Sequence, residues 1–392
     1  MTAVEEKRHD GYPTHRRKVR FDWSRTPLHW VPGDPFSTHM LNELHLLLPA
    51  GERWFIRVVD EAAPLVDDPE LEAAIKPFIQ QESWHAWAHQ VVLDHLAEQG
   101  IDTQPYTQLE KWLAKLGNQR SNWPQPLQRW WLYRRVADVA ALEHFTAVLG
   151  QWVIQNRGLD YAGTDPVMLD LLRWHGAEEI EHRSLVFDVY QNICGNYVIR
   201  AFSMLMTAPL FVSWWIAGAR YLMANDPTID AKWRWRDWLR AARQYKLPGP
   251  WRILVTVPLR YLRPSHHPST EASTQMAMDY LEHSPAATAA REKAARAQPD
   301  PDDDHSPGES GKVSRPATRQ DGRLQSGNLA ALRRHPADDV RVRHCRADFS
   351  GHVLLVAAGS DHEVGVLDRA LRHLRRRDDR ARPHRRRRGQ AR

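Results

Sequence analysis

Four long segments of the chain repeat apolar residues every three to four positions, which is the pattern of an α-helix that buries one face. Asp-Pro or Pro-Glu pairs stand where three of these segments begin, as at many helix starts. The expected helical segments are residues 37–63, 69–98, 127–155 and 165–193. The pattern therefore predicts an all-α protein whose centre is a four-helix bundle.

The first segment carries a carboxylate on its apolar face. Glu52 shares that face with Phe55, Ile56 and Val59, which follow it by three, four and seven positions. A buried carboxylate is costly without a partner, so the interior must supply one. Pro49 interrupts the segment, and we expect the helix to break or kink at that point.

The other three segments also place acids and histidines on their apolar faces. Two of them contain Glu-x-x-His, a spacing that puts both side chains on one side of a helix, about one turn apart. In chain order the inward residues are Glu52, Glu82 with His85, Glu143, and Glu179 with His182. The order Glu, Glu-x-x-His, Glu, Glu-x-x-His is the ligand set with which four facing helices hold two metal ions.

A single Glu-x-x-His often occurs by chance on a solvated helix, and a lone buried histidine is more often a hydrogen-bonded core residue than a ligand. The repeat argues against that interpretation here. Glu52 precedes Glu82 by 30 residues and Glu143 precedes Glu179 by 36, so each half has the length of a helical hairpin that returns to the same depth. The sequence thus predicts one dinuclear site with three ligands from each half, two of the glutamates bridging the ions.

Residues near these positions are candidates for supporting roles. His89 and His175 share the ligand-bearing faces, and Glu178 adjoins a ligand, so we predict that they orient the ligands, with the two histidines as candidate extra ligands. Glu143 is flanked on its face by small residues such as Gly150, which we expect to leave room beside the metal for dioxygen, water or a substrate chain. Iron or manganese suits such a donor set best, and zinc could replace them.

The chain changes character after these four segments. Residues 201–219 contain no charged side chain, and a membrane-spanning helix needs roughly 20 apolar residues. Pro209 weakens the interpretation as a membrane span. Three interpretations remain open: a membrane span, a helix in the membrane interface, or a fifth helix of the bundle. The basic and aromatic run at residues 232–238 is typical of bilayer surfaces and favours membrane contact.

Composition defines the two ends of the chain. Residues 1–36 are polar and rich in proline, as in an extended arm. From about residue 284 the sequence consists mainly of Ala, Arg, Pro, Asp, Gly and His, which bury too little apolar surface to fold, and we expect residues 266–392 to form a largely disordered tail. This leaves residues 37–197 as the di-metal bundle and residues 198–265 as a helical extension of it.

Charge and cysteine content narrow the class of protein. The formal net charge of the 392 residues is +6, but the basic excess lies mostly at the two ends, so we expect no nucleic-acid partner. Two cysteines, Cys194 and Cys345, cannot form a disulfide framework and indicate a reducing compartment. Residues 1–20 are charged and lack an apolar core, so we expect no signal peptide and a cytoplasmic protein, with a membrane surface as a candidate partner.

Three short motifs carry a resemblance to a known family: residues 47–55 (LLPAGERWF), 81–85 (QESWH) and 178–182 (EEIEH). Together they resemble the bacterial family of predicted metal-dependent hydrolases, over roughly residues 20–265. The order of the ligands is also similar to that of ferritin-like di-iron proteins such as the ribonucleotide reductase small subunit. The wider resemblance implies a ferritin-like bundle and the six metal residues assigned above.

The family name and the ligand set imply different chemistries. Hydrolysis of an ester or amide needs no further protein, whereas a di-iron site that activates dioxygen needs a separate reductase, because this chain has no domain that delivers electrons. The apolar residues 201–219 favour a hydrophobic small-molecule substrate. Two further classes remain open, a ferroxidase or iron store and a non-catalytic helical protein docked on a membrane. The main prediction is a hydrolase-family enzyme with a dinuclear, preferably di-iron, Glu/His site.

Overall fold

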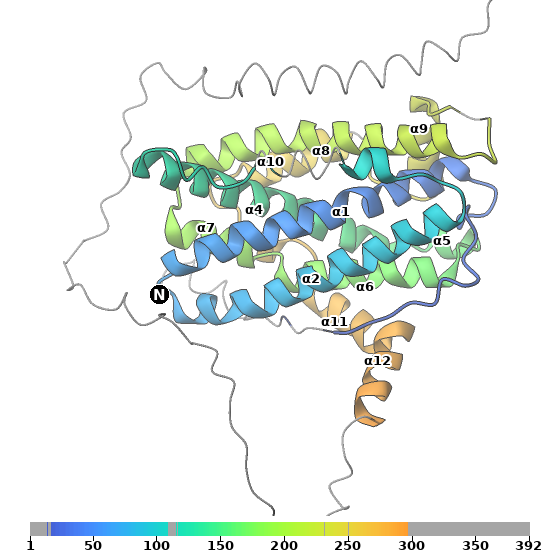
Figure 1. Cartoon of the computed structure of the whole chain (residues 1–392), viewed down its shortest axis with the longest axis horizontal. Helices are drawn as coiled ribbons and strands as arrows, with labels where there is room; N and C mark the ends of the chain where they lie inside the picture. Colours follow the sequence, from blue (N-terminus) through green and yellow to red (C-terminus); the bar gives the residue numbers. More distant parts are fainter. Residues whose placement is uncertain are drawn as a thin grey trace, which may run out of the picture. The chain divides into compact units, whose positions relative to one another are not determined.

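The protein is described from a computed structural model, in which residue 14 and residues 17–108, 115, 117–230, 232–249 and 251–296 are defined. Every regular element in these ranges is a helix (Figure 1). Five helices are long: α1 (Pro35–Ala62), α2 (Pro69–Glu98), α4 (Gln125–Gln155), α6 (Pro166–His182) and α8 (Tyr197–Asn225). The all-α class predicted from the sequence is confirmed.

Shorter helices complete this part of the chain. They are η2 (Ala63–Leu65), α5 (Gly158–Tyr161), α7 (Leu185–Ile193), α9 (Trp235–Gln244), the π-helix η3 (Arg252–Thr256), α10 (Val257–Tyr261), η4 (Pro268–Thr270), α11 (Thr274–His283) and α12 (Pro285–Arg296). The main packing pairs are α1 with α2, α4 with α6, and α8 with both α1 and α4. The two hairpins expected from the sequence, α1–α2 and α4–α6, are therefore both present.

Side-chain caps set where four of the five long helices begin. Asp34, Asp68 and Asp165 each precede a proline and accept hydrogen bonds from backbone N–H groups of the next turn. Asn196 caps α8 in the same way. These caps satisfy donors that the first turn of a helix otherwise leaves free, and they fix the start of each of these helices.

Two helices differ from their predicted bounds. α1 continues through Pro49 rather than breaking there; the proline removes one backbone hydrogen bond, but α1 packs against α2 and α8, and this packing holds the helix together. The predicted segment 165–193 is instead divided between α6 and α7. At the break, Arg183 Nε donates to Pro268 O at 3.2 Å and its Nη2 donates to Thr274 Oγ1 at 3.0 Å. This anchor from a distant segment leaves no signal in the local pattern.

The tail also differs from its prediction, because residues 268–296 form helices η4, α11 and α12. The carboxylate of Asp170 in α6 accepts hydrogen bonds from Tyr280 Oη at 2.7 Å, from Ser284 Oγ at 2.9 Å and from Ala286 N at 3.0 Å. A buried acid of the bundle thus fixes α11 and the start of α12, which composition alone does not reveal. The disordered tail predicted from residue 266 was wrong for this part, and residues 297–392 lie outside the described ranges.

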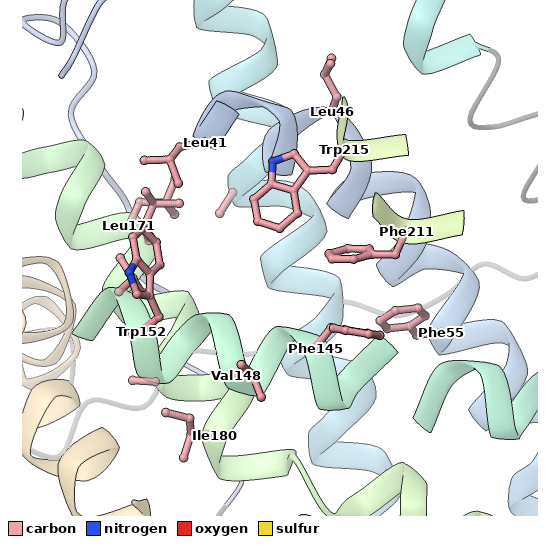
Figure 2. Packing of buried hydrophobic residues seen from close by; sticks show 14 of the residues in the cluster. Leu41, Leu46, Phe55, Phe145, Val148, Trp152, Leu171, Ile180, Phe211 and Trp215 are labelled. Carbon is pink, nitrogen blue, oxygen red and sulfur yellow. The ribbon is translucent and has the colours of Figure 1, made fainter. Parts of the chain in front are cut away.

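α8 packs into the bundle as a fifth helix. Its Phe211 stacks on Phe145 of α4 with ring centroids 5.2 Å apart, and Trp215 Nε1 donates to Met40 O in α1 (Figure 2). α8 is the one helix of the described part that is long and apolar enough to cross a membrane, and 44% of its apolar stretch is buried. Phe202, Leu205 and Leu210 on its outer side are exposed. Of the three interpretations left open by the sequence, the contacts support the fifth helix.

The described part of the N-terminal arm is irregular but packed. Val19, Trp30 and Val31 are almost fully buried against the helices. Trp84 Nε1 of α2 donates a hydrogen bond to Val19 O at 2.9 Å. These contacts bring Arg17 to the same end of α6 as the predicted ligands.

Candidate metal centre

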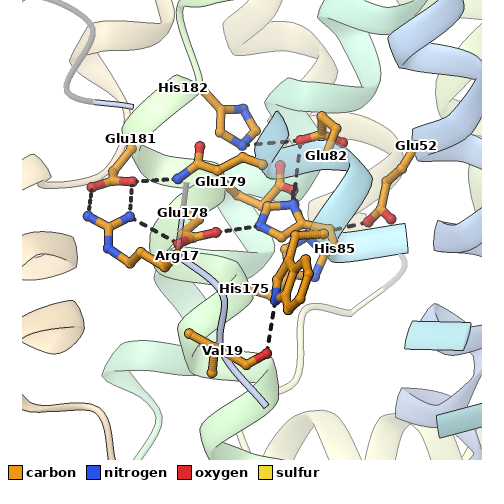
Figure 3. Close-up of polar contacts among 12 residues, drawn as sticks. Arg17, Val19, Glu52, Glu82, His85, His175, Glu178, Glu179, Glu181 and His182 are labelled. Atoms are coloured by element: carbon orange, nitrogen blue, oxygen red, sulfur yellow. Dashed lines mark hydrogen bonds and ion pairs between the residues drawn. The ribbon is translucent and has the colours of Figure 1, made fainter. Parts of the chain in front are cut away.

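The six predicted ligands lie together in the interior of the bundle, and none is more than 3% exposed. They come from four helices: Glu52 from α1, Glu82 and His85 from α2, Glu143 from α4, and Glu179 and His182 from α6. Figure 3 shows five of these side chains pointing toward one another. The helical period thus brought the acids and histidines to one place, as the sequence predicted.

One group of candidate ligand atoms joins α2 to α6. Glu82 Oε1 lies 3.3 Å from His182 Nε2 and 3.5 Å from His85 Nδ1. His85 Nδ1 is also 3.6 Å from Glu179 Oε1. The ligand atoms of Glu82, His85, Glu179 and His182 all lie within 4.8 Å of one another, which is close enough for a single ion to contact them.

A second group joins α1 to the same two helices. His175 Nε2 lies 2.6 Å from Glu179 Oε1 and 3.5 Å from Glu52 Oε1. The ligand atoms of Glu52, His85, His175 and Glu179 also fall within 4.8 Å of one another. His85 and Glu179 belong to both groups, so the two candidate ion positions are adjacent.

Each histidine of these groups turns one ring nitrogen toward the cluster and has the other held from behind. The pairs behind the cluster are His85 Nε2 with Glu178 Oε2 at 2.8 Å, His182 Nδ1 with Glu143 Oε2 at 2.9 Å, and His175 Nδ1 with His89 Nε2 at 2.6 Å. A metal-binding imidazole usually has such a partner, which fixes both the tautomer and the ring orientation. The pattern is therefore that of three preoriented ligands.

Further residues support these partners, and the sequence did not reveal them. Arg17 donates to Glu178 Oε1 at 3.0 Å and forms two 2.7 Å hydrogen bonds with the carboxylate of Glu181 (Figure 3). His45 Nδ1 lies 2.7 Å from His89 Nδ1. His45 precedes Glu52 by seven positions, or two helical turns, and this spacing could have identified it. Arg17 lies in the irregular arm, where no periodicity indicates its position.

Most of the buried atoms that face the cluster lack hydrogen-bond partners, whereas His175 Nε2 and Glu179 Oε1 bond to each other. Within the described residues, a partner is lacking for both carboxylate oxygens of Glu52 and of Glu82, for His85 Nδ1 and for His182 Nε2. Their mutual distances of 3.3 to 3.6 Å are longer than an ordinary N–H···O bond. Leaving buried acids in this state is costly, and cations between them would satisfy all of these atoms at once. The residues present therefore fit a metal centre.

A third group of potential ligands contrasts with this one. Asp226 Oδ2 accepts hydrogen bonds from His29 Nε2 at 2.6 Å and from His39 Nε2 at 2.8 Å, and its Oδ1 accepts two from Thr228. The facing atoms of this group are thus already satisfied by one another. It needs no cation, and it connects the N-terminal arm to α1 and the end of α8.

The acids and imidazoles of the cluster shift one another's pKa. Burial, then Glu82, raises the pKa of Glu52 well above its usual range, and burial, then Glu179, raises that of Glu143 to about 8. Burial would lower the pKa of His182, but Glu143 and Glu179 raise it to about 9. Burial alone would raise the pKa of Glu179, but His182 and His175 lower it to about 2. The cluster contains more buried carboxylates than cationic groups, which is why it retains protons. The same negative charge would attract divalent cations.

The small residues of α4 serve helix packing rather than the open space that the sequence suggested. A Cβ atom placed on Gly150 would lie 2.3 Å from Gly176 O of α6, so the two backbones touch. One turn before Gly150, Thr146 Oγ1 donates a hydrogen bond to Glu179 Oε2. A cavity of only about 50 Å³, lined in part by His175 and Glu179, remains beside this contact.

The sequence predicted three ligands from each half of the bundle, but the structure groups the ligands differently. Glu179 contacts both groups, and Glu143 lies outside both, with Oε2 on His182 Nδ1. His175, predicted as an extra ligand or a supporting residue, belongs to one group. His89 and Glu178 lie behind His175 and His85, as residues that orient a ligand would.

An all-helical fold with buried Glu/His groups defines a bundle protein with a candidate dinuclear metal centre. Residues 15–272 match a family described as predicted metal-dependent hydrolases. This match covers well over half of the chain, so the protein belongs to that family. Comparisons with curated proteins and with solved structures found no match.

Proposed function

We propose that the protein is a metal-dependent hydrolase with two metal ions bound inside the helical bundle. The observation that carries the proposal is the convergence of buried carboxylate and imidazole atoms without hydrogen-bond partners in the described residues. Glu52 and His175 would hold one ion, and Glu82 and His182 the other. Glu179 and His85 belong to both groups and would complete the two ligand sets.

The chain's own residues prepare this site before any ion enters. Glu178, Glu143 and His89 hold the three imidazoles in the orientation that keeps one nitrogen on the cluster. Arg17 offsets the charge of Glu178 and Glu181, which would otherwise repel the neighbouring acids. When bound, a pair of divalent ions supplies Lewis acidity and activates water at neutral pH.

Metal content of the purified protein tests the proposal directly. Wild type should contain two ions per chain, and the double variant Glu82→Ala, Glu179→Ala should contain none, with its helical circular dichroism largely kept. His29→Ala is the matched control, because it alters a His/Asp group whose members already satisfy one another. Full metal retention by the double variant would refute the assignment.

Oxidative chemistry is the second candidate, and the enclosure of the site favours it. The six residues that make up the two groups are all buried, and an apolar cavity adjoins them. Two irons held by Glu and His in such a place suit dioxygen activation, which would require a separate electron-transfer partner. Iron-loaded protein that is reduced without oxygen and then exposed to it should show a transient absorption if this candidate is correct. Zinc-supported ester cleavage without oxygen favours the hydrolase.

We also propose that the outer face of α8 rests on a membrane surface. Val198, Phe202, Leu205, Met206 and Leu210 are between 47% and 68% exposed and recur every three to four positions. η3 and α10 pack beside α8; α10 adds the exposed residue Leu259, and the exposed Trp251 directly precedes η3. An apolar face of this extent is unusual on a protein surrounded only by water.

A further inference from the structure

A large apolar cavity lies between α1, α4 and α8, next to the proposed metal centre. Its volume is about 270 Å³, and its walls include Trp54 and Phe55 of α1, Leu142 of α4 and Phe211 of α8. The charged side chains in its lining, Arg134 and Asp138, pair with each other, and the rest of the wall is mostly hydrocarbon apart from the hydroxyl groups of Thr146 and Thr207.

The inner end of this cavity adjoins the ligands. Leu48 and Thr146 line both this cavity and the smaller one that contains His175 and Glu179. Thr146 also donates its hydroxyl hydrogen bond to Glu179. A molecule in the large cavity would therefore end one side chain away from Glu179, which belongs to both ligand groups.

The outer end reaches the exposed face of α8. Met206 and Leu210 line the cavity and are 47% and 58% exposed, so they belong to both the wall and the surface. A cavity that is open to an apolar surface, and apolar along its length, admits a hydrocarbon chain without desolvating a polar group.

We propose that this cavity binds a long aliphatic chain of the substrate, with the reactive group at the Thr146 end and the rest of the chain toward α8. A cavity of 150 Å³ holds one benzene ring, so by proportion the 270 Å³ here accepts a chain of roughly ten carbons. The proposal names the substrate class of the proposed enzyme and rests on that function. A peptide segment is a poorer occupant, because the apolar wall would leave its backbone groups unsatisfied.

Titration calorimetry with decan-1-ol, a neutral ten-carbon probe, tests the cavity itself. Decan-1-ol should bind wild type with a negative heat-capacity change. Ala50→Phe places a ring in the cavity, where Ala50 is part of the wall, and should weaken binding at least tenfold. Ala73→Phe, at an exposed position of α2, should bind as wild type does. Equal affinity of Ala50→Phe and wild type, or no binding by wild type, would overturn the proposal.

Orientation of the chain is tested with decan-1-ol carrying ¹³C at C1 or at C10. In protein loaded with Mn²⁺, the C1 resonance should broaden more than the C10 resonance, and the difference should vanish in the Glu82→Ala, Glu179→Ala variant. Equal or reversed broadening would overturn the orientation. If wild type binds no Mn²⁺, the proposed function fails, whereas the calorimetric comparison still decides whether the cavity binds a chain.

Discussion

Gly150 and Gly176 bring the backbones of α4 and α6 into direct contact. A Cβ on Gly150 would lie 2.3 Å from Gly176 O, and a Cβ on Gly176 would lie 2.6 Å from the Gly150 Cα. Because both obstacles are backbone atoms, neither can move aside as a flexible side chain would. The contact sets the depth at which Thr146 reaches Glu179 and Glu143 reaches His182.

Gly176→Ala should therefore separate the two helices and loosen the centre. We expect it to destabilise the fold by about 1–3 kcal/mol, as overpacking does, and to lower metal content. Gly51→Ala is the control, since a Cβ there meets nothing within 4 Å and alanine favours the helix. Urea unfolding and metal analysis of both variants measure the effect. If Gly176→Ala is as stable as Gly51→Ala, the contact does not constrain the helices.

Glu178→Gln should weaken metal binding without altering any ligand. The carboxylate of Glu178 accepts the hydrogen bond from His85 Nε2 at 2.8 Å, and loss of such a partner lowers metal affinity by roughly 10- to 100-fold. Glu181→Gln is the matched control, because Glu181 shares Arg17 but its carboxylate bonds only to Arg17 and Gln81 among the described residues. Chelator competition with Zn²⁺ measures both affinities. Equal losses in the two variants would assign the effect to Arg17 rather than to His85.

The residues that converge could be predicted from the sequence because helical period decides which side chains share a face. Glu52, Glu82 and Glu179 needed only that rule and the expectation that buried acids have partners. The role of Glu143 needed more, since its position behind His182 depends on the depth of α4 against α6. Arg17 and the anchor of α12 on Asp170 are contacts across more than 100 residues, which no local pattern records.

Because Glu43 is buried, the free energy of unfolding of the protein should decrease as the pH rises. Burial raises the pKa of Glu43 to about 8 from the usual 4.5, so the folded protein retains a proton that the unfolded chain loses between these values. The free energy of unfolding therefore decreases by up to about 1.4 kcal/mol per pH unit in this window and levels off above it. Glu43→Gln, a neutral isostere, should match wild type near pH 4.5 and be more stable at pH 8. Urea unfolding at both pH values measures this, and a pH-independent difference would contradict it.

Removing apolar side chains from the outer face of α8 should reduce binding to lipid vesicles. Phe202 and Leu205 are 50% and 52% exposed, and neither of them lines the cavity. The exposed cationic residues at positions 232, 234 and 236 follow α8 and should strengthen attraction to anionic lipid. Sedimentation with vesicles of phosphatidylcholine and phosphatidylglycerol measures the affinity.

The double variant Phe202→Ser, Leu205→Ser should bind these vesicles roughly 30-fold more weakly, because each of the two apolar side chains that no longer enters the bilayer interface costs on the order of 1 kcal/mol. Tyr161→Ser, at an 88% exposed position on α5, is the control and should bind as wild type does. Sedimentation velocity without lipid tests the competing explanation, that this face of α8 binds a second copy of the chain. If wild type is a dimer that the double variant abolishes, and neither protein binds vesicles, a second copy of the chain covers this face instead of a membrane.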